Sequence, residues 1–254
     1  MIVMQYANGG NLLSFLEQNI NKLTWKMKLQ ILLDILNNLY TIHDRGLVHC
    51  DLHGGNIVLN CNASEIEGYL RSGLPFILIC DFGLSRSKNS GSNSIVQGVL
   101  PFIAPEVLHN YKFTQQSDMY AIGIIMHLIA SGEPPFRNRP FDEHLATAIC
   151  NGLRPAMPAT TPEAYGNLAR KCCDADPNKR PTAFESYRHI FRLIEGADKD
   201  KSDDNVWNTI YRRGDVEPLS RVEKESKYSS KMLPCESSYL PKPKNNGVDY
   251  SGTA

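Results

Sequence analysis

The chain lacks a net charge, because its 27 Lys and Arg residues balance 27 Asp and Glu residues. A protein without a global field has no general attraction for nucleic acid or for an anionic membrane, so we expect neither as a partner. The chain also lacks a long apolar run. Its most apolar segment, residues 121–130, is interrupted by His127 and is shorter than the roughly 20 residues that a membrane-spanning helix needs. This segment is predicted to be a buried core helix.

The seven cysteines lack the spacing of a disulfide framework or of a zinc site. They are odd in number and scattered, and Cys172 and Cys173 are adjacent. The N-terminal residues lack the basic and apolar regions of a secretory leader. These absences predict a reducing compartment, the cytoplasm. With 254 residues, of which 42% are hydrophobic, the chain can bury one domain core.

Hydrophobic periodicity predicts the elements of this domain. A turn is expected at residues 8–11. The predicted strands cover residues 1–7, 57–59 and 76–80, and the last two are expected to pair as a hairpin. The predicted helices cover residues 24–45, 117–131, 141–151, 162–173 and 182–195. After Gly196 the composition turns polar and loses its period, so residues 197–254 are expected to be mostly disordered.

Three polar motifs follow one another in the middle of the chain. They are His49-Cys50-Asp51-Leu52-His53-Gly54-Gly55-Asn56, Asp81-Phe82-Gly83 and Ala104-Pro105-Glu106. A carboxylate, an amide and a second carboxylate in this order suit phosphoryl transfer from ATP. Asp51 would accept the proton of the incoming hydroxyl. Asn56 and Asp81 offer the hard oxygen ligands that Mg²⁺ prefers.

Together with three later motifs, these segments resemble the eukaryotic protein kinase family over roughly residues 1–195. The later motifs are Ser117 to Gly123, Gly132 to Phe136 and Asp176 to Pro181. The resemblance implies an α+β, protein-kinase-like fold with a mainly α-helical C-terminal lobe and short β-hairpins. It places a kinase domain at residues 1–196, beginning at the hinge, and a polar tail at residues 197–254.

The resemblance also implies binding roles for several residues. Mg²⁺ would be held by Asn56 and Asp81 and would bridge the phosphates of ATP. The residues implied in nucleotide binding are Met4 at the back wall, Ala7 through its backbone, Asn11 toward the ribose and Val58 at the floor. The implied partners are ATP and a protein substrate.

Other matches to the family are architectural. Glu106 and Arg180 resemble a buried ion pair, and Asp118 is expected to accept hydrogen bonds from the catalytic-loop backbone above a packed His49. The histidines on helical patterns, His43, His127 and His189, are expected to be structural and without clustered partners.

Departures from the family pattern bear on specificity and regulation. Cys50 replaces an arginine that receives an activation-loop phosphate, and His53 replaces the lysine that is usual in serine/threonine kinases. Gly55 stands where tyrosine kinases commonly have an arginine. Because the tyrosine-kinase pattern is thus absent, serine or threonine is the preferred acceptor. The long connection between Asn56 and Asp81 predicts an exposed insertion around residues 61–73, within the connection 57–75.

No glycine-rich loop and no phosphate-binding lysine precede the predicted hinge, because only 50 residues lie before Asp51. We therefore expect the smaller N-terminal lobe to be absent from this chain and to be encoded upstream. A chain without that lobe is expected to bind ATP weakly and to turn over poorly.

The sequence is compatible with two other functions. A non-catalytic, pseudokinase-like binding module would keep the helical lobe for recruitment alone. A small-molecule phosphotransferase is the second alternative, since aminoglycoside- and choline-kinase-like enzymes use a loop similar to residues 49–56. The segments after Gly83 favour the protein kinase, because those enzymes lack the peptide-substrate lobe.

Overall fold

The computed structural model describes residues 7–60, 77–88, 96–199, 227–233 and 240–245. Its helices are α1 (Leu12–Asn19), α2 (Trp25–Asp44), α4 (Pro105–Asn110), α5 (Gln115–Ser131), α6 (Glu143–Cys150), α7 (Glu163–Cys172) and α8 (Ala183–Lys199). Its strands are β1 (Leu47–Val48), β2 (Ile57–Leu59), β3 (Ile77–Ile79), β4 (Arg86–Ser87), β5 (Gln97–Gly98) and β6 (Lys231–Met232). Short 3₁₀ turns lie at Ile20–Lys22, Phe82–Leu84, Leu100–Phe102 and Pro177–Lys179.

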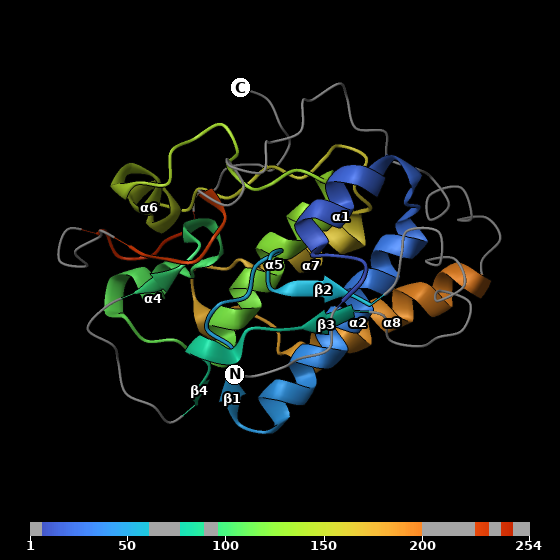
Figure 1. Cartoon of the computed structure of the whole chain (residues 1–254), viewed down its shortest axis with the longest axis horizontal. Coiled ribbons are helices and arrows are strands. Elements are labelled where there is room, and N and C mark those ends of the chain that lie inside the picture. Colours follow the sequence, from blue (N-terminus) through green and yellow to red (C-terminus); the bar gives the residue numbers. More distant parts are fainter. Residues whose placement is uncertain (1–6, 61–76, 89–95, 200–226, 234–239, 246–254) are drawn as a thin grey trace.

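Helix α5 is the centre of the domain, as predicted (Figure 1). Thr114 begins it with a capping box, and Gly132 ends it in the left-handed conformation. Every residue from Ser117 to Ser131 is buried, because α1, α2 and α7 pack around the helix. At Gly123 an added Cβ would lie 2.4 Å from Cys173 Sγ, so the absence of a side chain lets α7 approach closely.

The other predicted helices are confirmed within a few residues. Thr24 caps α2 through a bond from Met27 N, and α2 packs along α8 and against β3. Two helices were missed. The helix α1 has only eight residues and is stabilised by its Asn11 cap and by burial against α5 and β2. The helix α4 begins at Pro105, and proline suits this first position because its missing N–H would have no partner within the helix.

Three two-stranded antiparallel pairs replace a larger sheet in the described part of the chain. The predicted hairpin is confirmed as β2–β3, with Val58 opposite Leu78. The pairs β1–β4 and β5–β6 were not predicted. Each of their strands has two residues, and the partners are distant in sequence, so neither periodicity nor a turn signal marks them.

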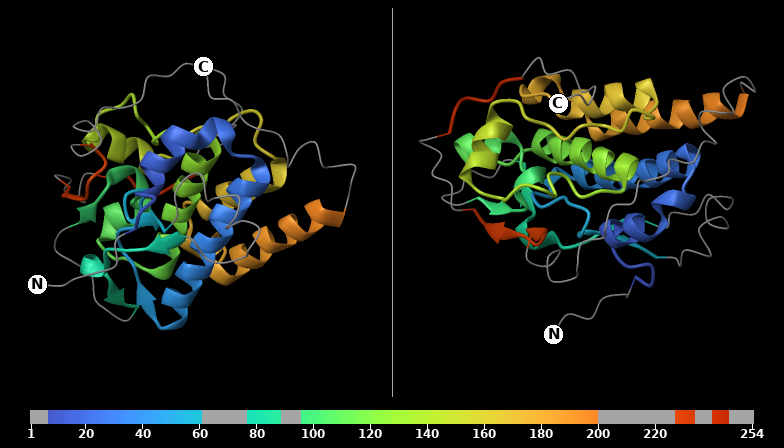
Figure 2. Two further views of the ribbon diagram at one scale, coloured as in Figure 1. Left: turned by 45° about the vertical axis from the view of Figure 1, so that its right-hand side comes forward. Right: turned by 90° about the horizontal axis from the view of Figure 1, so that it is seen from above.

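The elements form layers from front to back. Figure 2, right, shows the strand pairs on one side, α5 and α2 in the middle, and α7 and α8 behind them. None of the helices within the described ranges is long and apolar enough to cross a membrane. The predicted strand at residues 1–7 lies outside the described residues except for Ala7, and the predicted insertion around residues 61–73 lies wholly outside them.

Two segments of the tail that was expected to be mostly disordered, residues 227–233 and 240–245, are packed on the lobe. Tyr228 and Leu240 are 6% and 7% exposed, and β6 pairs with β5. On the opposite side, Asn245 receives a bond from Ala175 N at 2.8 Å. The sparse apolar residues of the tail suffice because the folded lobe supplies the surface that buries them, and composition alone does not reveal that surface.

Candidate active site

The catalytic loop, residues 49–56, is anchored on α5 by Asp118. The Asp118 carboxylate accepts bonds from His49 N at 2.8 Å and from Cys50 N at 3.0 Å, as predicted. Its Oδ2 also lies 2.9 Å from Nε2 of His43, so the expectation that His43 has no partner is wrong. The anchor holds Cys50 at a φ of 71°, which is uncommon for a residue with a side chain.

His49 joins the loop to the segment that carries Asp81. Its Nε2 lies 3.1 Å from the carbonyl oxygen of Cys80, and its Nδ1 accepts a bond from Asp51 N at 3.3 Å. These partners require the tautomer with hydrogen on Nε2. The ring is fully buried and contacts Phe82 at 5.1 Å between centroids. His49 therefore fixes the distance between the two acidic positions.

Asp51 and Asn56 form one hydrogen-bonded unit. The amide nitrogen of Asn56 donates to the Asp51 carbonyl at 2.9 Å and to its Oδ2 at 3.3 Å. Asp51 is 6% exposed, and this burial raises the pKa of its carboxyl. Its other oxygen, Oδ1, accepts a bond from the hydroxyl of Ser230 at 3.0 Å. Asp51 thus already holds a serine hydroxyl.

Asp81 faces the same pocket from the end of β3. It adopts a left-handed conformation, and its Oδ1 accepts a bond from Gly83 N at 3.2 Å. Asp51, Asn56 and Asp81 together line a cavity of about 310 Å³. The structure thus brings the three predicted catalytic residues together.

Two oxygen-bearing residues suit Mg²⁺ at this pocket. The nitrogen of Asn56 is used inside the protein, which leaves its amide oxygen for a cation, and the Asp81 carboxylate is exposed. Magnesium usually takes one or two protein oxygens and completes its shell with water and phosphate. No cluster of three or more His, Cys, Asp or Glu side chains suited to a metal occurs among the described residues. The donor set therefore fits a shared Mg²⁺–phosphate site.

The residues implied in nucleotide binding divide into two groups. Asn11 lines the pocket with Asp51, but its Oδ1 accepts the bond from Ser14 N that caps α1. Val58 is half-buried on β2 and forms a bridge with Asn11. Ala7 accepts a bond from Gly10 N in the predicted turn, and Met4 lies outside the described residues. The nucleotide roles of these four residues remain predictions.

His53 occupies the position where serine/threonine kinases usually have a lysine, but its imidazole is neutral near pH 7. Burial lowers its pKa to about 4, with a smaller effect of the same sign from His49. Its Nδ1 accepts a bond from Gly55 N at 3.1 Å, and its Nε2 lies 3.9 Å from Asp51 Oδ2. Near neutral pH this side chain supplies no positive charge for a phosphate.

The predicted ion pair below the site is confirmed. Arg180 donates to both carboxylate oxygens of Glu106, each at 2.7 Å. The same guanidinium donates to the carbonyls of Asp174 and Gln116 at 2.7 and 2.8 Å. This bidentate pair ties the start of α4 to the segment before α8.

Sequence reasoning missed Ser230 completely. It follows Asp51 by 179 residues and belongs to a polar tail with no motif around it. No local signal distinguishes it from the serines near it.

The fold and site define a helical α+β lobe that is arranged for phosphoryl transfer to a hydroxyl. A family model described as the protein kinase domain matches residues 1–192. The chain therefore belongs to the eukaryotic protein kinase family, and its described residues form the C-terminal-lobe type of that fold.

Curated relatives agree with this assignment. The chain is 32% identical over 187 residues to the probable serine/threonine-protein kinase roco9 of Dictyostelium discoideum, a match that covers 72% of this chain and 5% of that protein. It is 35% identical to the probable serine/threonine-protein kinase roco8 of the same organism, over 71% of this chain and 10% of the relative. It is 31% identical to the dual specificity protein kinase splA, also from Dictyostelium discoideum, over 74% and 8%. The chain spans only a small part of the length of these relatives.

Proposed function

We propose that this chain carries the catalytic and peptide-binding half of a serine/threonine protein kinase that uses ATP and Mg²⁺. One observation carries the proposal. The Asp51 carboxylate holds a serine hydroxyl at 3.0 Å inside the pocket that Asn56 and Asp81 also line. A base must lie within about 2.6–3.2 Å of the proton that it accepts. The remaining residues of the site support this chemistry.

The residues of the site have separate tasks. Asp51 orients the incoming hydroxyl and takes its proton, and Asn56 fixes the carboxylate through two bonds. Asn56 and Asp81 would hold Mg²⁺, which neutralises charge on the transferred phosphoryl group. The raised pKa of Asp51 makes it a stronger base than an exposed aspartate.

A short acceptor side chain fits this pocket best. Ser230 reaches Asp51 while the next residues pair with Gln97 and Gly98. A tyrosine hydroxyl lies about 4 Å farther from its backbone, so a tyrosine bound in the same way would collide with the loop. Two relatives are named as serine/threonine kinases, which agrees with this preference, and a third is named as dual specificity.

We further propose that the phosphate-binding lobe is encoded upstream and that the whole protein acts in the cytoplasm. Leu78 on β3 and Phe82, which follows Asp81, are 41% and 48% exposed, and a second lobe would cover such apolar side chains. Transcript sequencing tests the first part. A glycine-rich strand-turn-strand and a lysine-bearing strand should precede Met1 in frame, and an in-frame stop codon close to Met1 would contradict the proposal.

The activity is tested with the full-length protein, labelled ATP, Mg²⁺ and casein. Asp51→Asn should reduce incorporation by at least about a hundredfold, since it removes the base at the reacting hydroxyl. Asp142→Asn is the matched control, because Asp142 caps α6, does not line the pocket of Asp51, and asparagine caps equally well. Near-normal labelling by Asp51→Asn would refute the assignment.

The same assay separates the alternatives. A wild-type protein that folds but transfers no phosphate would favour the binding module. Transfer to an amino alcohol or aminoglycoside, with none to casein or to the protein itself, would favour the small-molecule phosphotransferase.

A further inference from the structure

The tail segment 227–233 occupies a groove at the edge of the active site. Its strand β6 pairs antiparallel with β5, with Lys231 opposite Gly98 and Met232 opposite Gln97. Leu233 N extends the pairing by donating to the carbonyl of Val96 at 3.0 Å. Figure 2, right, shows β6 beside β5 on the front of the lobe. The addition of a strand to an exposed edge is a common way to bind an extended peptide.

Side chains fix the position of the segment along the groove. Tyr228 is buried, its hydroxyl donates to the carbonyl of Pro135 at 3.2 Å, and its ring packs edge-on against Phe141 at 5.2 Å. Lys227 lies 4.8 Å from the centre of the Phe141 ring and donates to the carbonyl of Arg137. Because both anchors are on the N-terminal side of Ser230, they set which residue faces Asp51.

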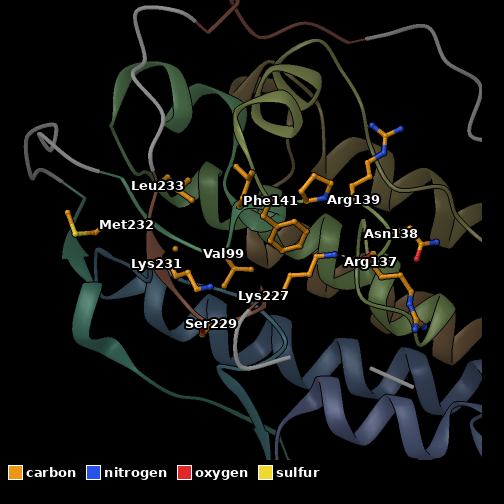
Figure 3. A pocket seen from close by; sticks show the side chains of 13 residues that line it. Val99, Arg137, Asn138, Arg139, Phe141, Lys227, Ser229, Lys231, Met232 and Leu233 are labelled. Atoms are coloured by element: carbon orange, nitrogen blue, oxygen red, sulfur yellow. Dashed lines mark hydrogen bonds between the residues drawn. The ribbon is translucent and has the colours of Figure 1, made fainter. Parts of the chain in front are cut away.

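A cavity of about 570 Å³ lies beside the docked segment. Figure 3 shows tail side chains between Lys227 and Leu233 along its wall, with Val99 and Phe141 beside them. The rest of the lining comes from Gly98 and Leu100 and from residues 137–140 in the connection between α5 and α6. The segment therefore lies on a concave surface of the lobe. It is held on one side by its pairing with β5 and on the other by contacts with the connection between α5 and α6.

Ser230 is the residue that this docking presents to Asp51. Its hydroxyl donates to Oδ1 of Asp51 at 3.0 Å. The adjacent Ser229 also lines the pocket but is exposed. A segment that only blocked the groove would not need a hydroxyl at this point. A hydroxyl bonded to the carboxylate has instead the geometry of a phosphoacceptor.

We infer that Ser230 is a self-phosphorylation site, which the kinase modifies in its own tail. This inference rests on the proposed function. The Ser230 oxygen bonds to the γ-phosphorus of ATP, the bond from that phosphorus to the bridging oxygen breaks, and ADP leaves. Asp51 takes the hydroxyl proton. The products are phosphoserine and ADP.

The modification should also open the groove. A phosphoserine carries about −2 charge at neutral pH, and here it would lie against the Asp51 carboxylate with Asp81 in the same pocket. Like charges at such short range repel, so the phosphorylated segment should leave. The tail then acts first as substrate and afterwards releases the site for other peptides.

The test uses full-length protein incubated with Mg²⁺ and ATP, followed by mass spectrometry that separates Ser229 from Ser230. Phosphate should appear on Ser230, and the fraction of molecules phosphorylated per unit time should not change with protein concentration. Ser230→Ala should remove this phosphate, and Ser229→Ala, the matched control, should retain it. Tyr228→Ala should slow it about tenfold or more, because the tail loses its dock and thus its effective concentration.

Casein in the same reaction distinguishes the two proposals. Labelled casein without phosphate on Ser230 would overturn this inference and leave the proposed function intact. No label on either would overturn both. A rate on Ser230 that rises with protein concentration would overturn transfer within one molecule.

A second readout needs no nucleotide and no activity. Hydrogen exchange should show protection of the amides at residues 96–98 and 231–233 in the unmodified protein. Ser230→Glu and Tyr228→Ala should each lose that protection, whereas Ser229→Ala should keep it. Unprotected amides in the wild-type protein would contradict the docked tail.

Discussion

The catalytic loop at residues 49–56 and the tail segment at residues 227–233 meet at Asp51, but they are held in different ways. The loop is anchored to Asp118, which is 2% exposed on the central helix. The tail is held by a two-residue strand, and Met232 on that strand is 63% exposed. The loop therefore belongs to the core of the domain, whereas the tail lies on its surface.

This difference means that the tail can leave the groove without any change in the geometry of the catalytic loop. Bonds to Asp118 break only if α5 moves, so the loop should open only with global unfolding. The tail buries few groups and should open locally at a much lower free energy. If Asp51 is the base and Ser230 the acceptor, as proposed, a rigid loop next to a removable segment suits repeated turnover.

The largest expected effect is on the rate of phosphoryl transfer at the rigidly held site of Asp51, Asn56 and Asp81. In the full-length protein Asp81→Asn should lower kcat by at least about a hundredfold and raise the Mg²⁺ concentration needed for half-maximal rate, because a neutral amide is a weaker ligand for the cation. Steady-state kinetics over a magnesium titration measure both. Asp142→Asn should change neither, and an unchanged magnesium requirement in Asp81→Asn would contradict the metal assignment.

The next effect is on stability beneath the loop. Glu106→Gln leaves the Arg180 guanidinium, whose side chain is fully buried, without its charged partner and should cost about 3–5 kcal/mol of unfolding free energy. Urea denaturation measures this loss. The double variant Glu106→Gln with Arg180→Met should recover part of it, because no charge is then left buried alone. A loss below about 1 kcal/mol in the single variant would mean that the pair is not needed.

Lowering the pH should reduce the unfolding free energy through His53 in the catalytic loop. The pKa of His53 is lowered to about 4 from 6.5, so the unfolded chain binds more protons between these values and stability falls as the pH drops through this window. At pH 5 the loss from His53 should be about 2 kcal/mol relative to pH 7. Urea denaturation of His53→Gln at both pH values should show a smaller fall than the wild type.

Exposed His144 supplies the control for this measurement. His144→Gln should keep the pH dependence of the wild type. If His53→Gln keeps it as well, the imidazole of His53 is not buried in its neutral form.

The smallest expected effect is on the tail. Tyr228→Ala should change the global unfolding free energy by less than about 1 kcal/mol, since the tail opens before the lobe unfolds. Trypsin should nevertheless cut after Lys227 and Lys231 several times faster in this variant. Leu240→Ala is the matched control, because Leu240 is buried in the other tail segment. Equal cutting rates in the two variants would mean that Tyr228 does not hold the segment.

The sequence by itself determined which residues form the proposed catalytic site and most of the helices that carry them. Asp51, Asn56 and Asp81 occur in short motifs whose order is specific, and the structure brings them into one pocket. The apolar residues of the segment 117–131 predicted α5, and the resemblance to the kinase family implied the pair Glu106–Arg180. These features are readable because each is encoded by residues near one another or by a motif with a defined partner.

Only the tertiary structure decided what surrounds those residues. The contact of His43 with Asp118, the pairing of β5 with β6 and the bond from Ser230 to Asp51 join residues 75 or more positions apart. Each is a single contact or a two-residue strand, too short to produce a periodic pattern, and it gains stability only after the helices have built the surface that receives it. The sequence therefore determines the three polar residues of the proposed site, and the fold determines that the hydroxyl of Ser230 meets Asp51.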